Sequence, residues 1–128
     1  MNKTIKIFSA SLLVFLTIGV APKLVQADDP VVVGPDIYKI LLENDRVRVM
    51  EIDFKPGAKI AMHSHPAHLV YILNGGALQI TTADGTVKNL EGKAGDVMWS
   101  EPETHKAENT GTTEVKGLVI ELKDQKAN

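Results

Sequence analysis

The chain has 128 residues, of which 44% are hydrophobic and 23% are charged, and its formal net charge at pH 7 is −2. A chain of this length suits one compact domain and not two. It contains no cysteine, which excludes a disulfide framework, thiolate chemistry and cysteine-based zinc sites.

Residues 1–27 have the pattern of a secretory signal peptide. Lys3 and Lys6 precede an apolar run over residues 7–20, and small residues lead up to Ala27,. A membrane anchor is disfavoured because the run is shorter than the roughly 20 residues that span a bilayer. We therefore predict cleavage after Ala27, a secreted or periplasmic location, and no membrane contact for the mature chain.

The mature domain is expected to be acidic. Lys3, Lys6 and Lys23 leave with the signal peptide and no acidic residue does, so 101 residues with 11 basic and 16 acidic side chains remain. A net charge of −5 argues against nucleic acid or an anionic membrane as a partner. Without disulfides, stability must come from a packed core, and a metal or a second subunit would add to it.

After an extended arm at residues 28–36, short β-type runs alternate with turn residues. No window of useful length shows helical periodicity with capping residues. The expected strands are 37–42, 46–54, 59–63, 69–73, 77–82, 86–90, 96–99, 105–109 and 115–122. Many short strands at regular spacing predict an all-β antiparallel sandwich or small barrel.

Two details of this pattern carry further expectations. Asn74-Gly75-Gly76 and Asp84-Gly85 predict hairpins, because such residues accept positive φ at little cost. In the run 46–54, the apolar positions change parity after Val49. This change indicates a bulge or a strand that is buried on both faces.

All four histidines fall in two short stretches, which predicts one metal site. His63 and His65 alternate onto one face of a strand, and His68 begins the next run,. A barrel can bring His105 beside them. Imidazoles without carboxylate or thiolate suit Fe(II), Ni, Cu or Zn and disfavour Mg and Ca. An exposed loop that binds metal only adventitiously is the alternative.

These stretches resemble the two sequence motifs of the cupin superfamily. The residues that carry the resemblance are Gly57, His63, His65 and Gly75 in the first motif and Gly95, His105 and Asn109 in the second. His68 stands where the family usually has Glu. The resemblance implies an antiparallel β-barrel, or jelly roll, over residues 37–123 and a tail at 124–128.

The resemblance also implies a ligand set and a chemistry. The expected ligands of a divalent metal are His63, His65, His68 and His105. Alternatively, His63, His65 and His105 bind the metal, and His68 lies behind them without binding it. Fe(II) is favoured, and Ni, Cu, Zn and Mn are alternatives. Three-His iron sites occur in cupin-like dioxygenases that act on thiols or β-diketones, and a neutral ligand set favours an anionic chelating substrate.

We therefore expect a metal-dependent dioxygenase that acts on a small organic molecule. A non-catalytic periplasmic protein that binds metal or a small ligand, and a metal-assisted isomerase, are the alternatives, because cupins host many chemistries. Cupins often pair through N-terminal strands, which predicts a homodimer.

Four other side chains near the motifs are expected to have roles outside the metal site. Trp99 and Tyr71 are expected to pack in the core. Glu101 and Glu103, in the turn before His105, are expected to be solvated, although either could serve as a general base or a charge at the rim of a pocket.

Overall fold

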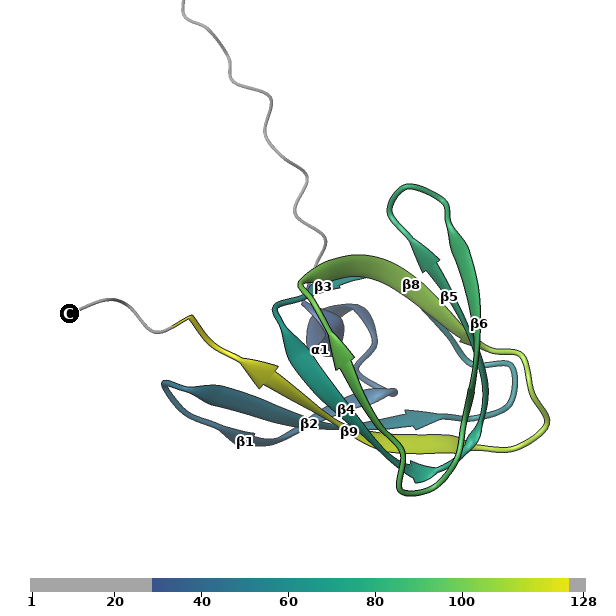
Figure 1. Cartoon of the computed structure of the whole chain (residues 1–128), viewed down its shortest axis with the longest axis horizontal. Helices are drawn as coiled ribbons and strands as arrows, with labels where there is room; N and C mark the ends of the chain where they lie inside the picture. Colours follow the sequence, from purple (N-terminus) through teal and green to yellow (C-terminus); the bar gives the residue numbers. More distant parts are fainter. Residues whose placement is uncertain (1–28, 125–128) are drawn as a thin grey trace, which may run out of the picture.

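Nine strands and one short helix make up the part of the chain that the computed structural model describes, residues 29–124 (Figure 1). The predicted signal peptide lies outside these residues. The elements are α1 (Pro30–Val33), β1 (Tyr38–Glu43), β2 (Val47–Phe54), β3 (Lys59–His65), β4 (His68–Asn74), β5 (Gly76–Thr82), β6 (Val87–Gly92), β7 (Val97–Ser100), β8 (Glu103–Asn109) and β9 (Val115–Leu122).

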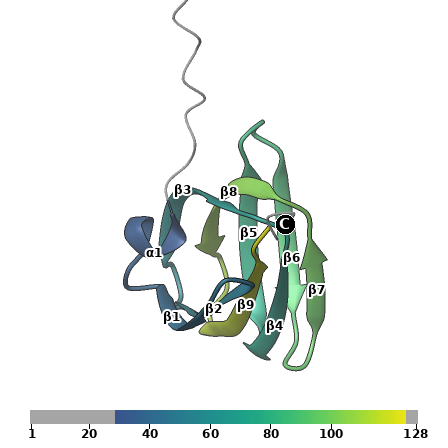
Figure 2. The ribbon, with the colours of Figure 1, turned by 90° about the vertical axis from the view of Figure 1, so that its left-hand side faces the viewer.

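The strands form two antiparallel sheets that face each other (Figures 1 and 2). One sheet has the order β1-β2-β9-β4-β7 and the other has the order β3-β8-β5-β6. The chain passes from one sheet to the other several times, as in a jelly roll. The all-β antiparallel fold of the cupin type is therefore confirmed, and each expected strand is present with its ends moved by only a few residues.

The core lies between the sheets and follows from the alternation of each strand. Met50, Ile52 and Phe54 are buried on the inner face of β2, and Val115 and Val119 are buried on the neighbouring β9. Ile60 and Ala107 face them from the other sheet. Burial of such side chains is the main stabilising contribution that a cysteine-free domain has.

The expected extended arm is wrong for residues 30–33, which form one turn of helix. Asp29 caps this turn, since its Oδ1 accepts a hydrogen bond of 2.9 Å from the amide of Val31, and Pro30 occupies the first turn. Pro is tolerated there because that amide would have no partner within the helix. Such a short element leaves no periodicity for a sequence pattern to detect.

Of the two explanations expected for the second strand, the bulge is wrong, and burial on both faces is only partial because the outward residues are half-buried. β2 pairs with β9 in continuous register from Val47 to Phe54, and the irregularity lies in β1, between Ile40 and Leu42. The parity of β2 does not change, because Arg48 belongs to the inward series of Met50, Ile52 and Phe54. Because Arg48 is charged, the sequence pattern did not show that it occupies an inward position, and the apolar positions alone indicated a change of parity.

The glycines have two separate uses in the turns. Gly57, Gly85 and Gly95 have positive φ of 77°, 86° and 92°, which L side chains rarely adopt,. The Asp84-Gly85 hairpin between β5 and β6 is confirmed. At Gly75, however, the chain crosses between sheets, and a Cβ there would lie 2.2 Å from the carbonyl oxygen of Gly92. Close backbone approach, and not a hairpin, requires this glycine.

Trp99 and Tyr71 are not in the core. Trp99 is 53% exposed and Tyr71 is 39% exposed on the outer face of the five-stranded sheet. Among the described residues, no helix is long and apolar enough to cross a bilayer.

Candidate metal centre

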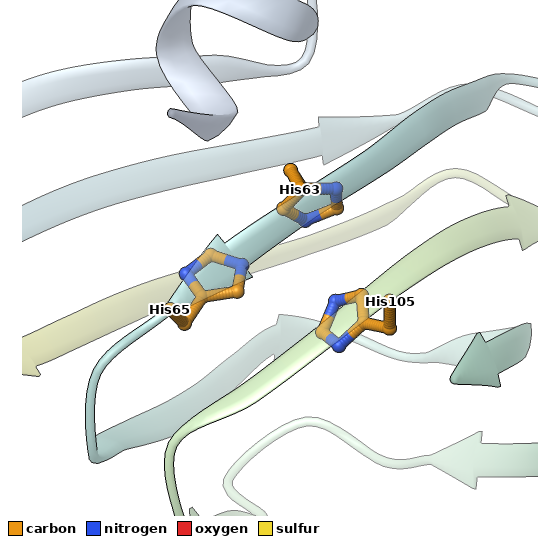
Figure 3. Close-up of side chains that lie close together, drawn as sticks. All are labelled: His63, His65 and His105. Carbon is orange, nitrogen blue, oxygen red and sulfur yellow. The ribbon is translucent and has the colours of Figure 1, made fainter. Parts of the chain in front are cut away.

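The pairing of β3 with β8 brings three histidines to one patch of the inner face. His63 lies directly opposite His105, and His65 is two residues along β3 from His63. One ring nitrogen from each of the three lies within 4.8 Å of the other two. All three side chains are buried, and Figure 3 shows their rings facing one another. This spacing is short enough for one ion to bind all three.

The ring of His63 is held by a backbone carbonyl. Its Nδ1 lies 2.8 Å from the carbonyl oxygen of Ala61, which can only accept, so Nδ1 carries the proton,. Nε2 then carries the lone pair, and it accepts a long hydrogen bond of 3.4 Å from the hydroxyl of Tyr38. A metal ion bound at this nitrogen would replace that hydrogen bond.

The ring of His65 is held by a carboxylate from the opposite sheet. Its Nδ1 donates to Glu121 Oε1 at 2.6 Å, and Arg48 Nε donates to Glu121 Oε2 at 2.8 Å. Burial by itself would raise the pKa of Glu121, but the hydrogen bonds from His65 and Arg48 outweigh it and hold the pKa below its usual value. Nε2 of His65 is therefore left for a ligand.

His68 borders this group without joining the close triad. Its ring centroid is 4.8 Å from that of His65, and its Nδ1 donates to the carbonyl of Pro66 at 2.8 Å. Its Nε2 lies 4.0 Å from Glu103 Oε1. The structure thus brings together all four predicted histidines but places only three of them within 4.8 Å. The assignment of His68 as a ligand stays a prediction.

The two acids of the turn before β8 differ. Glu101 is exposed and accepts from Trp99 Nε1 at 2.7 Å, as expected for a solvated residue. Glu103 instead begins β8 and points inward. Its Oε1 accepts from the hydroxyl of Ser100 at 2.8 Å and lies 3.2 Å from His105 Nδ1. The expectation that Glu103 is solvated is therefore wrong.

A polar row crosses the inner face of the five-stranded sheet beside the histidines. In register, Arg48 lies opposite Glu121, Glu121 opposite His68, and His68 opposite Ser100. The facing sheet contributes His65 and Glu103, which lie opposite each other in the register of β3 and β8. One end of the sandwich interior is thus polar while the rest is apolar.

Sequence analysis did not identify Arg48 or Glu121 as residues of the site. A signal was present, because Glu121 shares the inward parity of Val115 and Val119, and Arg48 shares that of Met50. An acid and a base at inward positions of two strands indicate a buried ion pair if the strands are neighbours. That β2 and β9 are neighbours is known only from the fold.

Comparison with known proteins finds similar proteins among the solved structures. No protein-family model and no curated protein sequence matches the chain. Among solved structures, a cupin domain from Bordetella pertussis is 28% identical over 69% of this chain and 93% of its own length, with a TM-score of 0.63. A cupin superfamily protein from Desulfitobacterium hafniense is 24% identical over 69% and 77%, with a TM-score of 0.54.

A third match is a conserved protein with a double-stranded β-helix domain from Klebsiella pneumoniae. It is 24% identical over 85% of this chain and 81% of its own length, with a TM-score of 0.56. The chain is a cupin. The histidines of this cupin therefore lie in the fold that the two motifs predicted.

A cavity of about 240 Å³ opens beside the histidines of the cupin. His65, His68, His105 and Glu103 line its polar end. Most of the remaining wall is apolar and comes from both sheets: Ile52, Phe54, Val70, Ile72, Leu78, Ile80, Leu90, Met98, Ala107 and Val119. Lys88, from the edge strand β6, adds one cation to the lining. The cavity suits a small molecule with an apolar body.

The donor set of this cupin fits a transition metal. The Nδ1 atoms of His63 and His65 are occupied by hydrogen bonds, so both rings present Nε2. The buried Nδ1 of His105 makes no hydrogen bond, because its contact with Glu103 lacks the required geometry. His105 is thus the ring whose orientation is least fixed by the protein, and coordination by a metal would fix it.

Burial favours the neutral form of His63, His68 and His105, and metal binding requires neutral imidazoles. Burial lowers the pKa of His63 to about 4 and that of His105 to about 4, and neighbouring histidines add to both effects. The pKa of His68 is also lowered, mainly by burial. The pKa of Glu103 is below its usual value, because the Ser100 hydrogen bond and the nearby His105 outweigh its burial. These three histidines are therefore expected to be neutral beside an ionised Glu103 at neutral pH.

Proposed function

We propose that this cupin binds one divalent transition metal through His63, His65 and His105 and acts as a metal-dependent dioxygenase on a small organic molecule. The observation that carries the proposal is the place of the triad. Three imidazole donors converge, and two of them, His65 and His105, line the polar end of an apolar cavity. A structural metal site is usually closed by four protein ligands, whereas three ligands beside a cavity leave positions open for substrate.

The nature of the donors supports a redox-active metal. Imidazole nitrogens bind Fe, Ni, Cu and Zn well and bind Mg or Ca poorly. A three-His iron site also occurs in some cupin-like dioxygenases, so we favour Fe(II). When bound, the metal would act as a Lewis acid toward substrate and supply the redox chemistry with dioxygen.

The residues around the metal would select and orient the substrate. Apolar walls from both sheets exclude water from the body of the ligand, and a cavity of about 240 Å³ limits its size. Lys88 forms no ion pair within 4 Å among the described residues, so its ammonium group is available to an anionic substituent. We infer that the substrate is small, largely apolar and anionic.

A second candidate, a metal-assisted isomerase, gains support from Glu103. Such chemistry requires a general base near the metal. Glu103 is ionised, lines the cavity and lies 3.2 Å from His105. The two functions differ in their consumption of dioxygen, and exchange of substrate hydrogen with solvent deuterium without dioxygen uptake would favour the isomerase.

The test begins with elemental analysis of the mature protein, purified without a histidine tag. Iron, nickel, copper or manganese near one equivalent supports the redox enzyme. Dioxygen uptake is then measured with a panel of thiols, β-diketones and phenols, and the His63→Ala/His105→Ala double variant is the control. Stoichiometric uptake that the control lacks is the expected result. Metal binding without uptake or exchange would indicate a binding protein, and no metal even on titration would contradict the proposed site.

A further inference from the structure

We propose that Glu121 is a positioning residue of the metal centre, and that Arg48 and Asp29 hold it in place as an ionic chain that begins at α1. The inference rests on the metal site proposed above. It extends that site to residues that belong to neither histidine motif and that are not among the residues lining the cavity.

Glu121 is fixed by two partners that engage different oxygens. Its side chain is buried, with 3% of the residue exposed. Oε1 accepts from His65 Nδ1 at 2.6 Å, and Oε2 accepts from Arg48 Nε at 2.8 Å. The carboxylate cannot rotate without breaking a charge-assisted hydrogen bond, and such bonds are the stronger ones in proteins. The direction of the His65 ring is therefore set by β9.

This bond joins the two sheets at the metal site. His65 belongs to β3 of the four-stranded sheet, and Glu121 belongs to β9 of the five-stranded sheet. By accepting the Nδ1 hydrogen, Glu121 selects the tautomer of the neutral His65 ring in which Nε2 carries the lone pair, and it fixes the direction of that lone pair. Carboxylate partners of this kind improve metal binding by histidine.

The chain of charges continues to the first described residue. Arg48 Nη1 lies 2.5 Å from Asp29 Oδ2, while Asp29 Oδ1 accepts from the amide of Val31 and caps α1. Pro30, next in the chain, is fully buried. Since each group holds the next, the order of α1 and the geometry of His65 are coupled, and such coupling acts in both directions.

A buried ion pair can also serve stability alone, so the experiment must separate the two roles. A purely structural role would lower the free energy of unfolding and leave the metal environment of the folded protein unchanged. A positioning role changes the metal affinity and the ligand field of a protein that is still folded. The readouts are therefore affinity and a metal spectrum, with unfolding measured alongside.

The variants follow the chain from the metal outward: Glu121→Gln, Arg48→Met and Asp29→Asn. Asn caps helices as well as Asp does, so Asp29→Asn removes the charge and keeps the cap. The matched control is Glu108→Gln on β8. The carboxylate of Glu108 forms an ion pair with Lys59, with 3.0 Å between the charged atoms, and among the described residues it makes no ion pair or hydrogen bond with a histidine. The probes are Zn²⁺, whose affinity is measured by competition with a chromophoric chelator, and Co²⁺, whose visible absorption reports ligand geometry.

Glu121→Gln is expected to weaken Zn²⁺ binding about 10- to 100-fold and to shift the Co²⁺ spectrum. Arg48→Met should have a smaller effect in the same direction, Asp29→Asn the smallest, and Glu108→Gln none. Wild-type affinity and an unchanged spectrum in folded Glu121→Gln would overturn the inference. If that variant does not fold, unchanged values for both Arg48→Met and Asp29→Asn overturn it. A wild-type protein that binds neither ion would instead overturn the proposed metal site itself.

Discussion

Hydrogen bonds at Nδ1 orient three of the four histidine rings. His63 and His68 donate to backbone carbonyls two residues away, and His65 donates to a buried carboxylate. In the neutral form of each of these rings, Nε2 is then the nitrogen without a proton. Because a preformed donor set loses little order on binding, the site is well suited to tight coordination.

The histidines should differ in their contribution to metal binding. His63→Ala and His105→Ala are expected to abolish binding, because each removes one of three closely spaced donors. His68→Ala is expected to weaken it only partly, because His68 borders the triad and contacts Glu103 at 4.0 Å. Titration calorimetry with Zn²⁺ measures all three. Equal loss in the three variants would show that His68 is a full ligand.

The stability of the metal-free protein should depend on pH through His63 and His105. Each pKa falls to about 4 in the fold, mainly through burial, from an ordinary value of 6.5. Between these values the unfolded chain binds more protons than the native state, so stability rises with pH there. The free energy of unfolding should be highest above pH 6.5 and should fall as the pH drops toward 4.

Urea unfolding of the chelator-treated protein at pH 7 and pH 5 measures this effect. The midpoint should be lower at pH 5, and the His105→Phe variant should show a smaller difference because it has one titrating group fewer. Equal midpoints at the two pH values would mean that these rings are not buried in their neutral form.

Among the elements, β9 does most to place the site. It lies between β2 and β4 in the five-stranded sheet, and its inward residues include both the core valines and Glu121. It approaches β4 closely at Gly117, where an added Cβ would lie 2.8 Å from the carbonyl oxygen of Tyr71. The strands can keep this spacing only while residue 117 has no side chain.

Gly117→Ala should therefore lower the free energy of unfolding by about 1–3 kcal/mol, the usual cost of overpacking a well-packed interior. The matched control is Gly92→Ala, whose new Cβ would meet Ile72 at an ordinary contact distance of 3.4 Å. Chemical denaturation of both variants gives the comparison. A Gly117→Ala protein as stable as the control would show that β9 and β4 can separate without penalty.

The whole molecule has an apolar outer face on its five-stranded sheet. One row crosses all five strands through cross-strand pairs: Leu42, Val49, Ile120, Leu69 and Trp99. A second row includes Leu118, Tyr71 and Val97. Leu42, Trp99, Tyr71 and Val97 are exposed, and the residues between them are half-buried. A contiguous apolar surface of this kind is typical of protein interaction sites. This face supports the expectation of a homodimer, which is the commonest closed assembly.

We expect the mature protein to elute as a dimer in size-exclusion chromatography with light scattering. Val97→Glu should shift it toward monomer, because a charge would be buried in the interface. The matched control is Val87→Glu, which changes another exposed valine (53% exposed, against 64% for Val97) on β6 of the other sheet. A monomeric wild-type protein at micromolar concentration, or equal effects of both variants, would contradict this assembly.

Local patterns in the sequence were sufficient to predict the strands, the antiparallel class and the gathering of the four histidines. Alternation and turn residues act over a few positions, and the spacing of His63 and His65 puts both on one face of a strand whatever the rest of the fold. That only three of the four histidines form a close triad was known only from the structure. The one-turn helix α1 was missed because four residues show no period.

Tertiary structure alone decided which charged groups surround the histidines. Arg48 and Glu121 are 73 positions apart, and Glu121 and His65 are 56 apart. Their contacts depend on β9 pairing with β2 and facing β3 across the interior. The inward turn of Glu103 depends likewise on where β8 begins. Side-chain parity is a local property, but the partner that a side chain meets is fixed by strand order, which no short stretch of sequence encodes.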